Sequence, residues 1–527
     1  MRSKISVELI VKHAKVYTLD KDNTVCEAFA VKDGKIVAIG SEKEITKKYR
    51  ATTVEDAGGR CVLPGFYDAH CHFTGYAQSL QYIDLRGSRS IKEVIERLKK
   101  HQKEHPSAWL CGRGWDQNLW KDKNFPNRKD LDSVFGSIPI VLTRIDGHAV
   151  LVNSKAMQLA GINENTKFPA GEAIIEEGKL SGMFREGMTE KFRLLVPKPV
   201  EDEMCELIEL AQANCFAAGL TSVVDAGIEN QDVDRIVSLQ QKGYLKLRID
   251  AWLHPTKENI KTFVLTGVIK TPYLHIHSIK LYADGALGSR GAWLLKPYSD
   301  EPQTSGISTI DTVELERICS IALRHGYQVC THAIGDAANR MVLNVYGKML
   351  GGPNDRRWRI EHAQVIDSAD VSLFGKYNII PSVQATHATS DMDWAGLRLG
   401  NRIKNAYLYK RLLDQNGWLP NGTDFPIEEI YPIYTLYAAV ARKAKDGHPV
   451  GGFQMRDALT RIEALRSMTI WAAQASFEEK EKGTLEKGKY ADFVIWNTNL
   501  MSCQDSEILT AKPFKTYSGG QLVFEAK

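Results

Sequence analysis

Residues Leu63–Phe73 read LPGFYDAHCHF, a short apolar run that ends on two histidines. Side chains alternate between the two faces of a strand, so His70 and His72, two positions apart, share one face. Two neutral imidazoles on one face are half of a site for a divalent transition metal. Asp68 lies on the same face, and Pro64-Gly65 marks a turn just before the predicted strand. This stretch predicts a strand that presents metal ligands at its carboxyl end.

Four further stretches end a strand-like run on a polar side chain. They are HSIKLYADG at His277–Gly285, VCTHAIGD at Val329–Asp336, WRIEHA at Trp358–Ala363 and LPNGTDFP at Leu419–Pro426. Each is typical of the carboxyl end of a strand that opens into a loop, where a (β/α)8 barrel carries its catalytic groups. Five such stretches in this order are a specific signal, whereas any one of them alone is weak.

The order His-x-His, Lys, His, His, Asp resembles the amidohydrolase superfamily of metal-dependent hydrolases. Four phrases look like its YtcJ-like branch, which includes N-substituted formamide deformylases: LPGF at 63–66, KLYADG at 280–285, THAIGD at 331–336 and GTDFP at 422–426. The resemblance covers essentially the whole chain. It implies an α/β fold with a (β/α)8 TIM-like barrel, zinc or a similar metal, and hydrolysis of an amide-type bond. It does not imply a particular substrate.

Length and composition agree with this interpretation. A chain of 527 residues is too long for one small domain and suits a barrel with insertions and an accessory domain. The 68 Lys and Arg against 64 Asp and Glu leave a charge of +4, too small to indicate a nucleic-acid partner. Nine cysteines without a Cys-x-x-Cys pair do not indicate a disulfide framework. With neither a signal-peptide core nor a membrane-length apolar run, we expect a cytoplasmic enzyme for a small-molecule substrate; a homo-oligomer stays open.

Both ends of the chain are rich in short predicted strands. These are Val7–Val11, Lys15–Thr18, Ala28–Val31 and Lys35–Ile39 near one end and Phe493–Trp496 near the other. We therefore expect one small β-sandwich built from residues 1–63 and 475–527, as the resemblance also implies, and a barrel over residues 64–474. The charged run Glu478–Lys482 is interpreted as a solvated helix end or loop.

The distance along the chain from His72 to Lys280 is about 200 residues, more than a plain barrel needs there. We expect an insertion near the barrel mouth within residues 84–199. Trp115, Asp146 and His148 lie in this range and are candidates for the substrate-binding pocket. The alternative, given equal weight, is a packed aromatic and a hydrogen-bonded turn.

A second His-x-His, formed by His275 and His277, precedes Lys280 on the same predicted strand. Strand alternation places both histidines on the face opposite Lys280, so we favour a structural role for them. His254 and His387 are ambiguous, and either could lie at a strand end near the substrate.

The predicted metal ligands are His70, His72, Lys280, His332, His362 and Asp424, for one or two zinc or similar ions. For the histidines, the alternative is a hydrogen-bonded core. A buried ammonium is costly, so Lys280 has three interpretations. It could form a salt bridge with Asp284 or Asp424, or lie as a charged neighbour of one metal. The third, which the resemblance implies and we favour, is a lysine carboxylated to a carbamate that bridges two metals.

Asp424 is the predicted catalytic residue. A carboxylate beside a metal can accept a proton from the attacking water and donate it to the leaving nitrogen. The alternative is a turn aspartate that caps the next helix. Asp284 and Asp336 are expected to support the ligands or the loops, and Glu361 should face away from His362 in a regular strand.

These features predict a metal-dependent hydrolase acting on carbon–nitrogen bonds other than peptide bonds, with N-acyl or N-formyl amides as the first choice. A deaminase or a cyclic amidase on the same scaffold is the alternative enzyme. A catalytically silent binding protein is the alternative from another class. The intact set of predicted ligands argues against silence, because a degenerate site would be expected to lose one of them.

Overall fold

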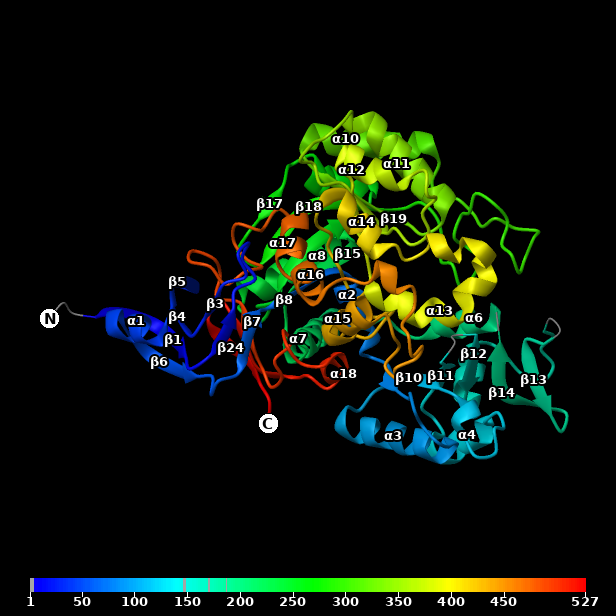
Figure 1. Cartoon of the computed structure of the whole chain (residues 1–527). Coiled ribbons are helices and arrows are strands. Elements are labelled where there is room, and N and C mark those ends of the chain that lie inside the picture. The colour runs from blue at the N-terminus through cyan, green and yellow to red at the C-terminus, as the bar shows by residue number, and fades with distance from the viewer. Residues whose placement is uncertain (1–3, 146–147, 169–170, 186) are drawn as a thin grey trace. The chain divides into compact units, whose positions relative to one another are not determined.

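Seven parallel strands form the central sheet of the computed structural model, which describes residues 4–145, 148–168, 171–185 and 187–527 (Figure 1). In spatial order they are β8 (Phe66–Cys71), β15 (Leu220–Ile228), β16 (Arg248–Leu253), β18 (Leu274–Tyr282), β19 (Gln328–Ala333), β20 (Arg359–His362) and β21 (Ile380–Ser382). The short β17 (Ile269–Lys270) pairs antiparallel with β18. Nearly all residues of the seven strands are buried, as in parallel sheets covered on both faces. The predicted barrel is confirmed.

The irregular segment 421–425 lies between the two edge strands β21 and β8. The N–H of Gly422 donates to the carbonyl of Val383, just after β21, over 2.9 Å. The N–H of Asp424 donates to the carbonyl of His70, in β8, over 2.8 Å. Eight strands were expected, but the φ of 63° at Asp424 is incompatible with a regular eighth strand. An irregular segment, joined by backbone hydrogen bonds to β8 and to the residue after β21, therefore occupies the position of the eighth barrel strand.

Helices alternate with the strands along the chain. They are α1 (Glu42–Lys48), α2 (Phe73–Ser79), α7 (Glu201–Ala217), α8 (Asn230–Gln241), α9 (Lys257–Asn259), α10 (Thr312–His325), α11 (Asp336–Leu350), α12 (Val371–Tyr377), α13 (Ala385–Leu399), α14 (Tyr409–Asn416), α15 (Pro432–Ala441), α16 (Arg461–Ser467), α17 (Ile470–Ala475) and α18 (Asp505–Ile508). Single helical turns occur at Ile260–Val264, Gly400–Asn405 and Met455–Asp457.

Helix α10 shows how the sequence sets these boundaries. The side chain of Asp311 accepts a hydrogen bond from the N–H of Glu314 and caps the amino end, and Gly326, with φ of 74°, ends the helix. Between them Leu315, Ile318, Cys319 and Ala322 are buried, at the spacing of one helix face. That apolar face is what binds the helix to the rest of its unit.

Strands from both ends of the chain share one sheet. Its order is β24 (Gln521–Glu525), β23 (Pro513–Ser518), β22 (Phe493–Trp496), β7 (Cys61–Pro64), β2 (Lys15–Tyr17) and β3 (Val25–Cys26). A second sheet has the order β5 (Lys35–Gly40), β4 (Ala28–Lys32), β1 (Ile5–Lys12) and β6 (Tyr49–Asp56). One buried apolar cluster joins the two sheets, and in it the ring of Phe493 stacks on that of Tyr517 at 4.4 Å. In Figure 1 these are the blue strands and the red strands.

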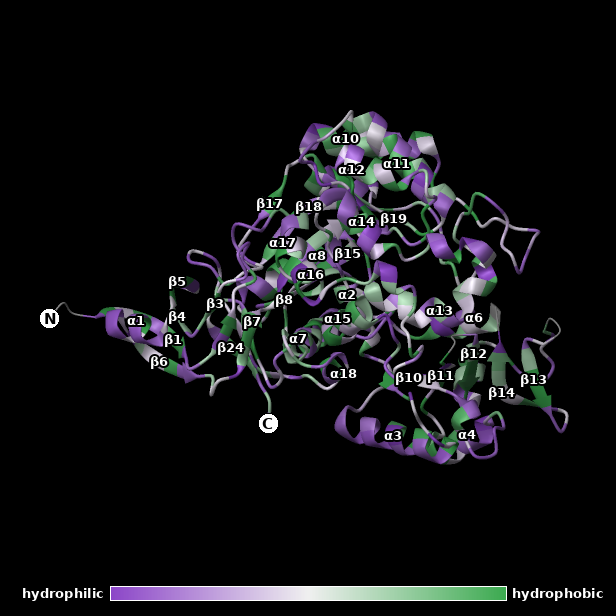
Figure 2. Ribbon diagram, in the orientation of Figure 1, coloured by the Kyte–Doolittle hydropathy of each residue, from purple (hydrophilic) through white to green (hydrophobic). Residues whose placement is uncertain are grey.

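Residues Ala77–Leu207 form a separate unit from Met1–Tyr76 and Ile208–Lys527. Its sheet has the order β13 (Ala173–Glu176), β14 (Lys179–Arg185), β12 (Ala149–Val152), β11 (Ile140–Arg144), β10 (Leu110–Trp115) and β9 (Ile83–Asp84). Its helices are α3 (Ile91–Glu104), α4 (Arg128–Phe135), α5 (Ser154–Leu159), α6 (Gly187–Leu195) and a turn at Gln117–Leu119. Figure 2 shows α3 mostly hydrophilic and β12 hydrophobic, which matches an outer helix and a core strand. No helix in the described part of the chain has the length and apolar character needed to cross a membrane.

Candidate metal centre

His70 lies at the end of β8 and is completely buried. Its Nδ1 is 2.6 Å from Oε2 of Glu361, a contact that orients the ring and leaves Nε2 directed toward Asp424, whose Oδ1 is 3.6 Å away. Burial, followed by the charge of Lys280, lowers the pKa of His70 well below its usual value. His70 is therefore a neutral imidazole with one nitrogen available as a metal ligand.

The carboxylate of Glu361 is fully buried and makes several polar contacts. Its Oε2 accepts a hydrogen bond from the Ser382 hydroxyl at 2.7 Å, and the Arg359 guanidinium forms an ion pair with its Oε1 at 2.8 Å. Glu361 was expected to face away from His362, but it contacts His70, whose ring centroid is 5.0 Å from that of His362. The reason is the φ of 72° at His362, which breaks strand alternation. Glu361 thus fixes the orientation of a candidate ligand.

His72 follows β8 and is partly exposed. Its Nδ1 lies 2.8 Å from the carbonyl oxygen of Ala226, which can only accept, so Nδ1 carries the proton. The lone pair is then on Nε2, which is 3.4 Å from Oδ1 of Asp424. Both histidines of the first motif therefore direct Nε2 to the same carboxylate.

Lys280 is buried in β18, and its Nζ lies 3.3 Å from Nε2 of His70. Burial lowers the pKa of Lys280 to about 8, so roughly a tenth of the amine is neutral at pH 7. Among the described residues, no salt bridge joins it to Asp284 or Asp424, which speaks against the salt-bridge interpretation. The geometry is compatible with a reactive amine at the centre.

His332 and His362 end strands β19 and β20, and their ring centroids are 4.5 Å apart. Burial lowers the pKa of His332 to about 3 and that of His362 well below its usual value, so both rings are neutral. Nε2 of His332 lies 3.5 Å from Oδ1 of Asp284, which itself accepts the N–H groups of Ile334 and Gly335. Asp284 thus supports the loop after β19, as expected.

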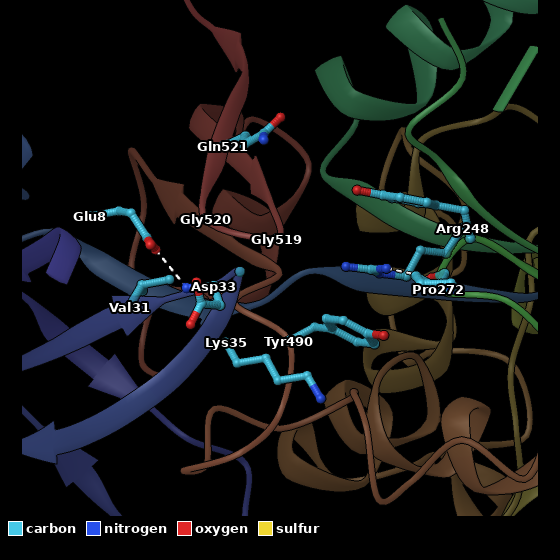
Figure 3. A pocket seen from close by; sticks show the side chains of 12 residues that line it. Glu8, Val31, Asp33, Lys35, Arg248, Pro272, Tyr490, Gly519, Gly520 and Gln521 are labelled. Carbon is cyan, nitrogen blue, oxygen red and sulfur yellow. Dashed lines mark hydrogen bonds between the residues drawn. The ribbon is translucent and has the colours of Figure 1, made fainter. Parts of the chain in front are cut away.

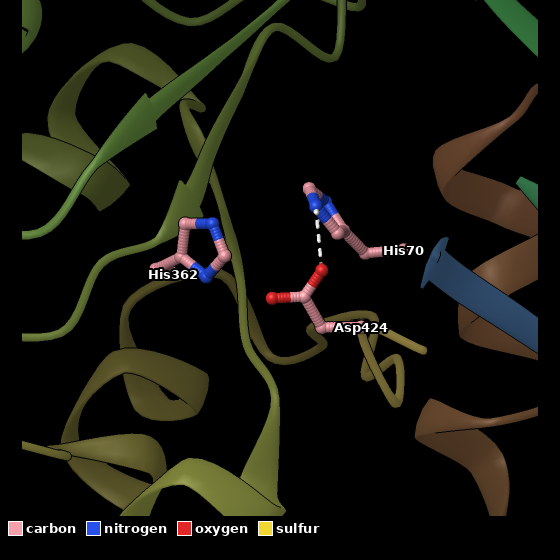
Figure 4. A group of neighbouring side chains, drawn as sticks. All are labelled: His70, His362 and Asp424. Atoms are coloured by element: carbon pink, nitrogen blue, oxygen red, sulfur yellow. Dashed lines mark ion pairs between the residues drawn. The ribbon is translucent and has the colours of Figure 1, made fainter. Parts of the chain in front are cut away.

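Asp424 lies close to several of the candidate ligands. Figure 4 shows its carboxylate beside the rings of His70 and His362. One potential ligand atom of each of these three buried residues lies within 4.8 Å of the other two. Burial alone would raise the pKa of Asp424, but the histidines around it, His72 first and then His70 and His387, hold it at about 2. The carboxylate is therefore ionised at neutral pH.

His387, which the sequence left ambiguous, also reaches this carboxylate. It lies in the first turn of α13, and its Nε2 is 3.4 Å from Oδ2 of Asp424. Its ring stacks parallel to that of His362 at 5.7 Å. The sequence signal for His387 is its position five residues after the strand Ile380–Ser382, because the other candidate ligands also lie at or after the ends of strands.

Several polar atoms at the centre are buried without a hydrogen-bond partner. They are Nε2 of His332, Nδ1 of His362, Nε2 of His387 and Oδ1 of Asp424. Burying such atoms unpaired costs free energy, unless a cation binds them. Neutral imidazoles and an ionised carboxylate are the donor set that zinc and similar divalent metals prefer, so the residues fit the metal that the sequence predicts.

The candidates for substrate binding lie in the unit Ala77–Leu207. Trp115 is 1% exposed in that unit's apolar core, and its indole N–H donates to the carbonyl of Leu142 over 2.9 Å. The structure therefore favours the packed-aromatic alternative for Trp115. His148 is exposed just before β12, and Asp146 lies outside the described residues.

A pocket of about 620 Å³ lies elsewhere in the unit that carries the barrel, beside the strands of the chain ends (Figure 3). None of the six predicted ligands lines it. Its most basic group, Arg248, forms a bidentate pair with Asp492, donates to the carbonyl of Pro272 and lies over the ring of Tyr490 at 3.8 Å. This guanidinium is satisfied within the protein and is not a ready anion site.

Comparisons with known proteins agree with this geometry. The model of the Amidohydrolase family matches residues 53–524. The chain is 30% identical over 526 residues to the putative amidohydrolase YtcJ of Bacillus subtilis, covering 97% of this chain and 98% of that protein. It is 24% identical to the N-substituted formamide deformylase of Arthrobacter pascens, with 98% of each covered. A solved structure, an uncharacterized metal-dependent hydrolase from Pyrococcus horikoshii, superposes with a TM-score of 0.77 at 28% identity, covering 94% of this chain and 99% of that chain.

Proposed function

The chain belongs to the amidohydrolase family, and from this premise we propose that it is a metal-dependent hydrolase acting on carbon–nitrogen bonds other than peptide bonds. One observation carries the proposal: His70, His362 and Asp424 converge, buried, at the carboxyl ends of barrel strands, with polar atoms left unpaired. In barrels of this type the catalytic groups lie at that end.

The proposed ligands divide into two groups. His70, His72 and Asp424 would hold one zinc or similar ion, and His332 and His362 a second one. Lys280, carboxylated on its neutral amine, would bridge the two. When bound, such a metal polarises the scissile carbonyl and makes water a better nucleophile.

Asp424 is the proposed proton carrier. Its carboxylate is ionised, so it can accept the proton of the attacking water and deliver it to the leaving nitrogen. Nε2 of His387 lies 3.4 Å from Oδ2 and Nε2 of His72 lies 3.4 Å from Oδ1, so each carboxylate oxygen faces an imidazole.

For the substrate we propose an N-acyl or N-formyl amide. The support is the similarity over the full length to an N-substituted formamide deformylase. His148, exposed just before β12, remains the proposed determinant of substrate preference, and His148→Ala should change the ranking of substrates without changing the metal content.

The first experiment is elemental analysis of protein purified without chelator, followed by assays on a panel of formamides, acyl amides, cyclic amides and aminopurines. We expect one to two equivalents of zinc or a similar metal per chain at the candidate metal centre and release of amine from the acyclic amides. His362→Asn should lose metal and activity, whereas the exposed His105→Asn serves as the matched control and should keep both. Active protein without metal would refute the mechanism, and release of ammonia from aminopurines alone would identify a deaminase.

A further inference from the structure

A second cluster of potential metal ligands lies in the same unit of the protein, built from β16 and β18. It consists of Asp250, His275 and His277, all buried, and their potential ligand atoms all lie within 4.8 Å of one another. Nδ1 of His277 is 3.2 Å from Oδ1 of Asp250. Two ligands of one tetrahedral zinc ion are about 3.3 Å apart, given metal–ligand bonds of roughly 2.0–2.1 Å. The distance between the ligand atoms of Asp250 and His277 is therefore that of two ligands of one ion.

The polar atoms of this cluster are unpaired to an unusual degree. Both carboxylate oxygens of Asp250, Nδ1 of His275 and both ring nitrogens of His277 are buried without a well-directed hydrogen bond, although Nδ1 of His277 lies 3.2 Å from Oδ1 of Asp250. The side chains of Asp250, His275 and His277 are 0%, 6% and 4% exposed. Buried polar groups are nearly always satisfied, so this many unpaired atoms at one point indicates a missing partner. A cation would satisfy the carboxylate and both imidazoles together.

The protonation states agree with a cation site. Burial alone would raise the pKa of Asp250, but the two histidines hold it below its usual value, so the carboxylate is ionised. Burial lowers the pKa of His275 to about 2, which leaves that ring neutral. An ionised carboxylate and a neutral imidazole are the forms that bind metal.

A simple histidine–aspartate ion pair is the main competing interpretation. It would put a proton on Nε2 of His277 without any acceptor for it, because that atom has no partner. It would also place an imidazolium on the stacked ring of His275, whose centroid is 3.8 Å away with the planes inclined by 14°. One metal bound by both rings avoids both costs, since coordination uses lone pairs and needs no additional acceptor. Because a ligated imidazole holds the metal in its own ring plane, one of the two stacked rings would turn toward the ion on binding.

The neighbouring charges permit a cation here. Glu478 lies 3.9 Å from Nδ1 of His275 and pairs with Lys482 at 2.9 Å, so this pair adds no net charge. Glu478 also accepts the hydroxyl hydrogen of Tyr67 at 2.9 Å, and the buried hydroxyl of Ser476 lies beside Asp250. The charge left at the cluster is the single negative charge of Asp250, and Glu478 or Ser476 is placed to complete the ligand set.

We propose that Asp250, His275 and His277 form a second metal site, for zinc or a similar borderline transition metal, with a structural role. Two histidines and a carboxylate are the ligands such metals favour. His275 precedes Lys280 by five strand residues, about 16 Å at roughly 3.3 Å per residue, so this site is distinct from the candidate metal centre. It lies toward the amino ends of the strands, where barrels hold stabilising groups and not catalytic ones. The metal would fasten β16 to β18 and to the segment after α17.

The decisive experiment is anomalous diffraction at the zinc edge on crystals of the full chain grown or soaked with zinc chloride. We expect one peak bounded by Asp250, His275 and His277, in addition to any peak at Asp424. In His362→Asn the peak at Asp424 should weaken while the peak at the second cluster remains. Density at Asp424 with none at the second cluster would overturn the proposal and leave the proposed function untouched.

A variant gives an independent test in solution. Asp250→Asn keeps the shape of the side chain and removes its charge, so it should lose about one equivalent of zinc per chain and the part of the melting temperature that depends on zinc. Turnover per remaining metal should stay within about twofold, because Asp250 does not contact the candidate centre. Unchanged zinc content in folded Asp250→Asn would show that the cluster is only a polar network. If that variant does not fold, the diffraction result on the unaltered protein decides.

Discussion

At the scale of single residues, the backbone conformation of Asp424 fixes the position of its side chain. Its φ of 63° is uncommon for a residue other than glycine, and its N–H is fixed to the carbonyl of His70. The carboxylate is thereby kept close to His70 at the end of β8, to His72 just after it and to His362 at the end of β20. The strained backbone and the unpaired Oδ1 occur at one residue, as expected where function outweighs local stability.

Asp424→Asn should lower turnover about a hundredfold or more, the usual effect of losing a general acid–base. The amide is nearly the same size, so the melting temperature should change little and some metal should remain. Steady-state kinetics and metal analysis on the same preparation test this. An unaltered rate would remove Asp424 from proton transfer.

Lys280 should show its reactivity in the pH dependence of metal loading. Its pKa is lowered from 10.5 to about 8, so the neutral amine that reacts with carbon dioxide is roughly a tenth of the population at pH 7 and nine tenths at pH 9. Metal-free protein given zinc and bicarbonate should therefore regain activity several-fold faster at pH 9 than at pH 7. Lys280→Arg, which keeps the charge and cannot form the carbamate, is the control. Equal rates with and without bicarbonate would contradict the carbamate.

At the scale of elements, the segment 421–425 depends on the small size of Gly422. A Cβ atom at this position would lie 2.4 Å from the nitrogen and 2.7 Å from the oxygen of His70, which is backbone that cannot move away easily. The close approach of this segment to β8 is what aligns Asp424 with His70.

Gly422→Ala should displace the segment from β8, lowering both the melting temperature and the metal content, because Asp424 would move with it. Gly396→Ala is the matched control, since its Cβ would meet nothing within 4 Å and alanine favours the helix α13 that contains it. Thermal unfolding and metal analysis of both variants check the expectation. Full metal occupancy in folded Gly422→Ala would show that the close approach is not needed.

The elements were largely predictable because each has a local signal. The strand over Phe493–Trp496 and the order of the barrel strands follow from apolar runs bounded by turns. Residues whose role depends on distant partners were not predictable in the same way. Glu478 and Lys482 were expected to be solvated, yet they are 4% and 5% exposed, because Tyr67 and His275 come from strands far away in sequence.

The residues of the candidate site likewise fall into those that a local motif predicted and those that it did not. His70, His362 and Asp424 were proposed together from strand-end motifs, and the structure brings them within 4.8 Å. His387 has no strand-end motif of its own because it lies in a helix, and Glu361 was expected on the wrong side because alternation fails where His362 adopts a positive φ. Pattern rules describe regular structure, and functional residues often lie where it ends.

At the scale of the whole molecule, the unit Ala77–Leu207 has two buried apolar clusters of its own, and Trp115 belongs to one of them. Trp115→Ala should cost about 3–5 kcal/mol of stability, as truncation of buried aromatics does. The metal content of protein that stays folded should not change, because no predicted ligand belongs to this unit. The exposed Leu194→Ala, in α6 of the same unit, is the control and should cost less than about 0.5 kcal/mol. A raised KM with an unchanged melting temperature would restore Trp115 to substrate binding.

The sheet shared by both ends of the chain cannot form completely until synthesis of the chain is nearly finished. Val62 in β7 lies opposite Ile495 in β22, so β7 leaves the ribosome roughly 430 residues before its neighbour exists. At about 5–20 residues per second this is a delay of roughly 20–90 s. During that time β7 presents an open edge, which invites pairing with other nascent chains. A chain terminated after Tyr490 should therefore accumulate in the insoluble fraction of a lysate, and supplying a peptide of residues 491–527 during translation should return part of it to the supernatant.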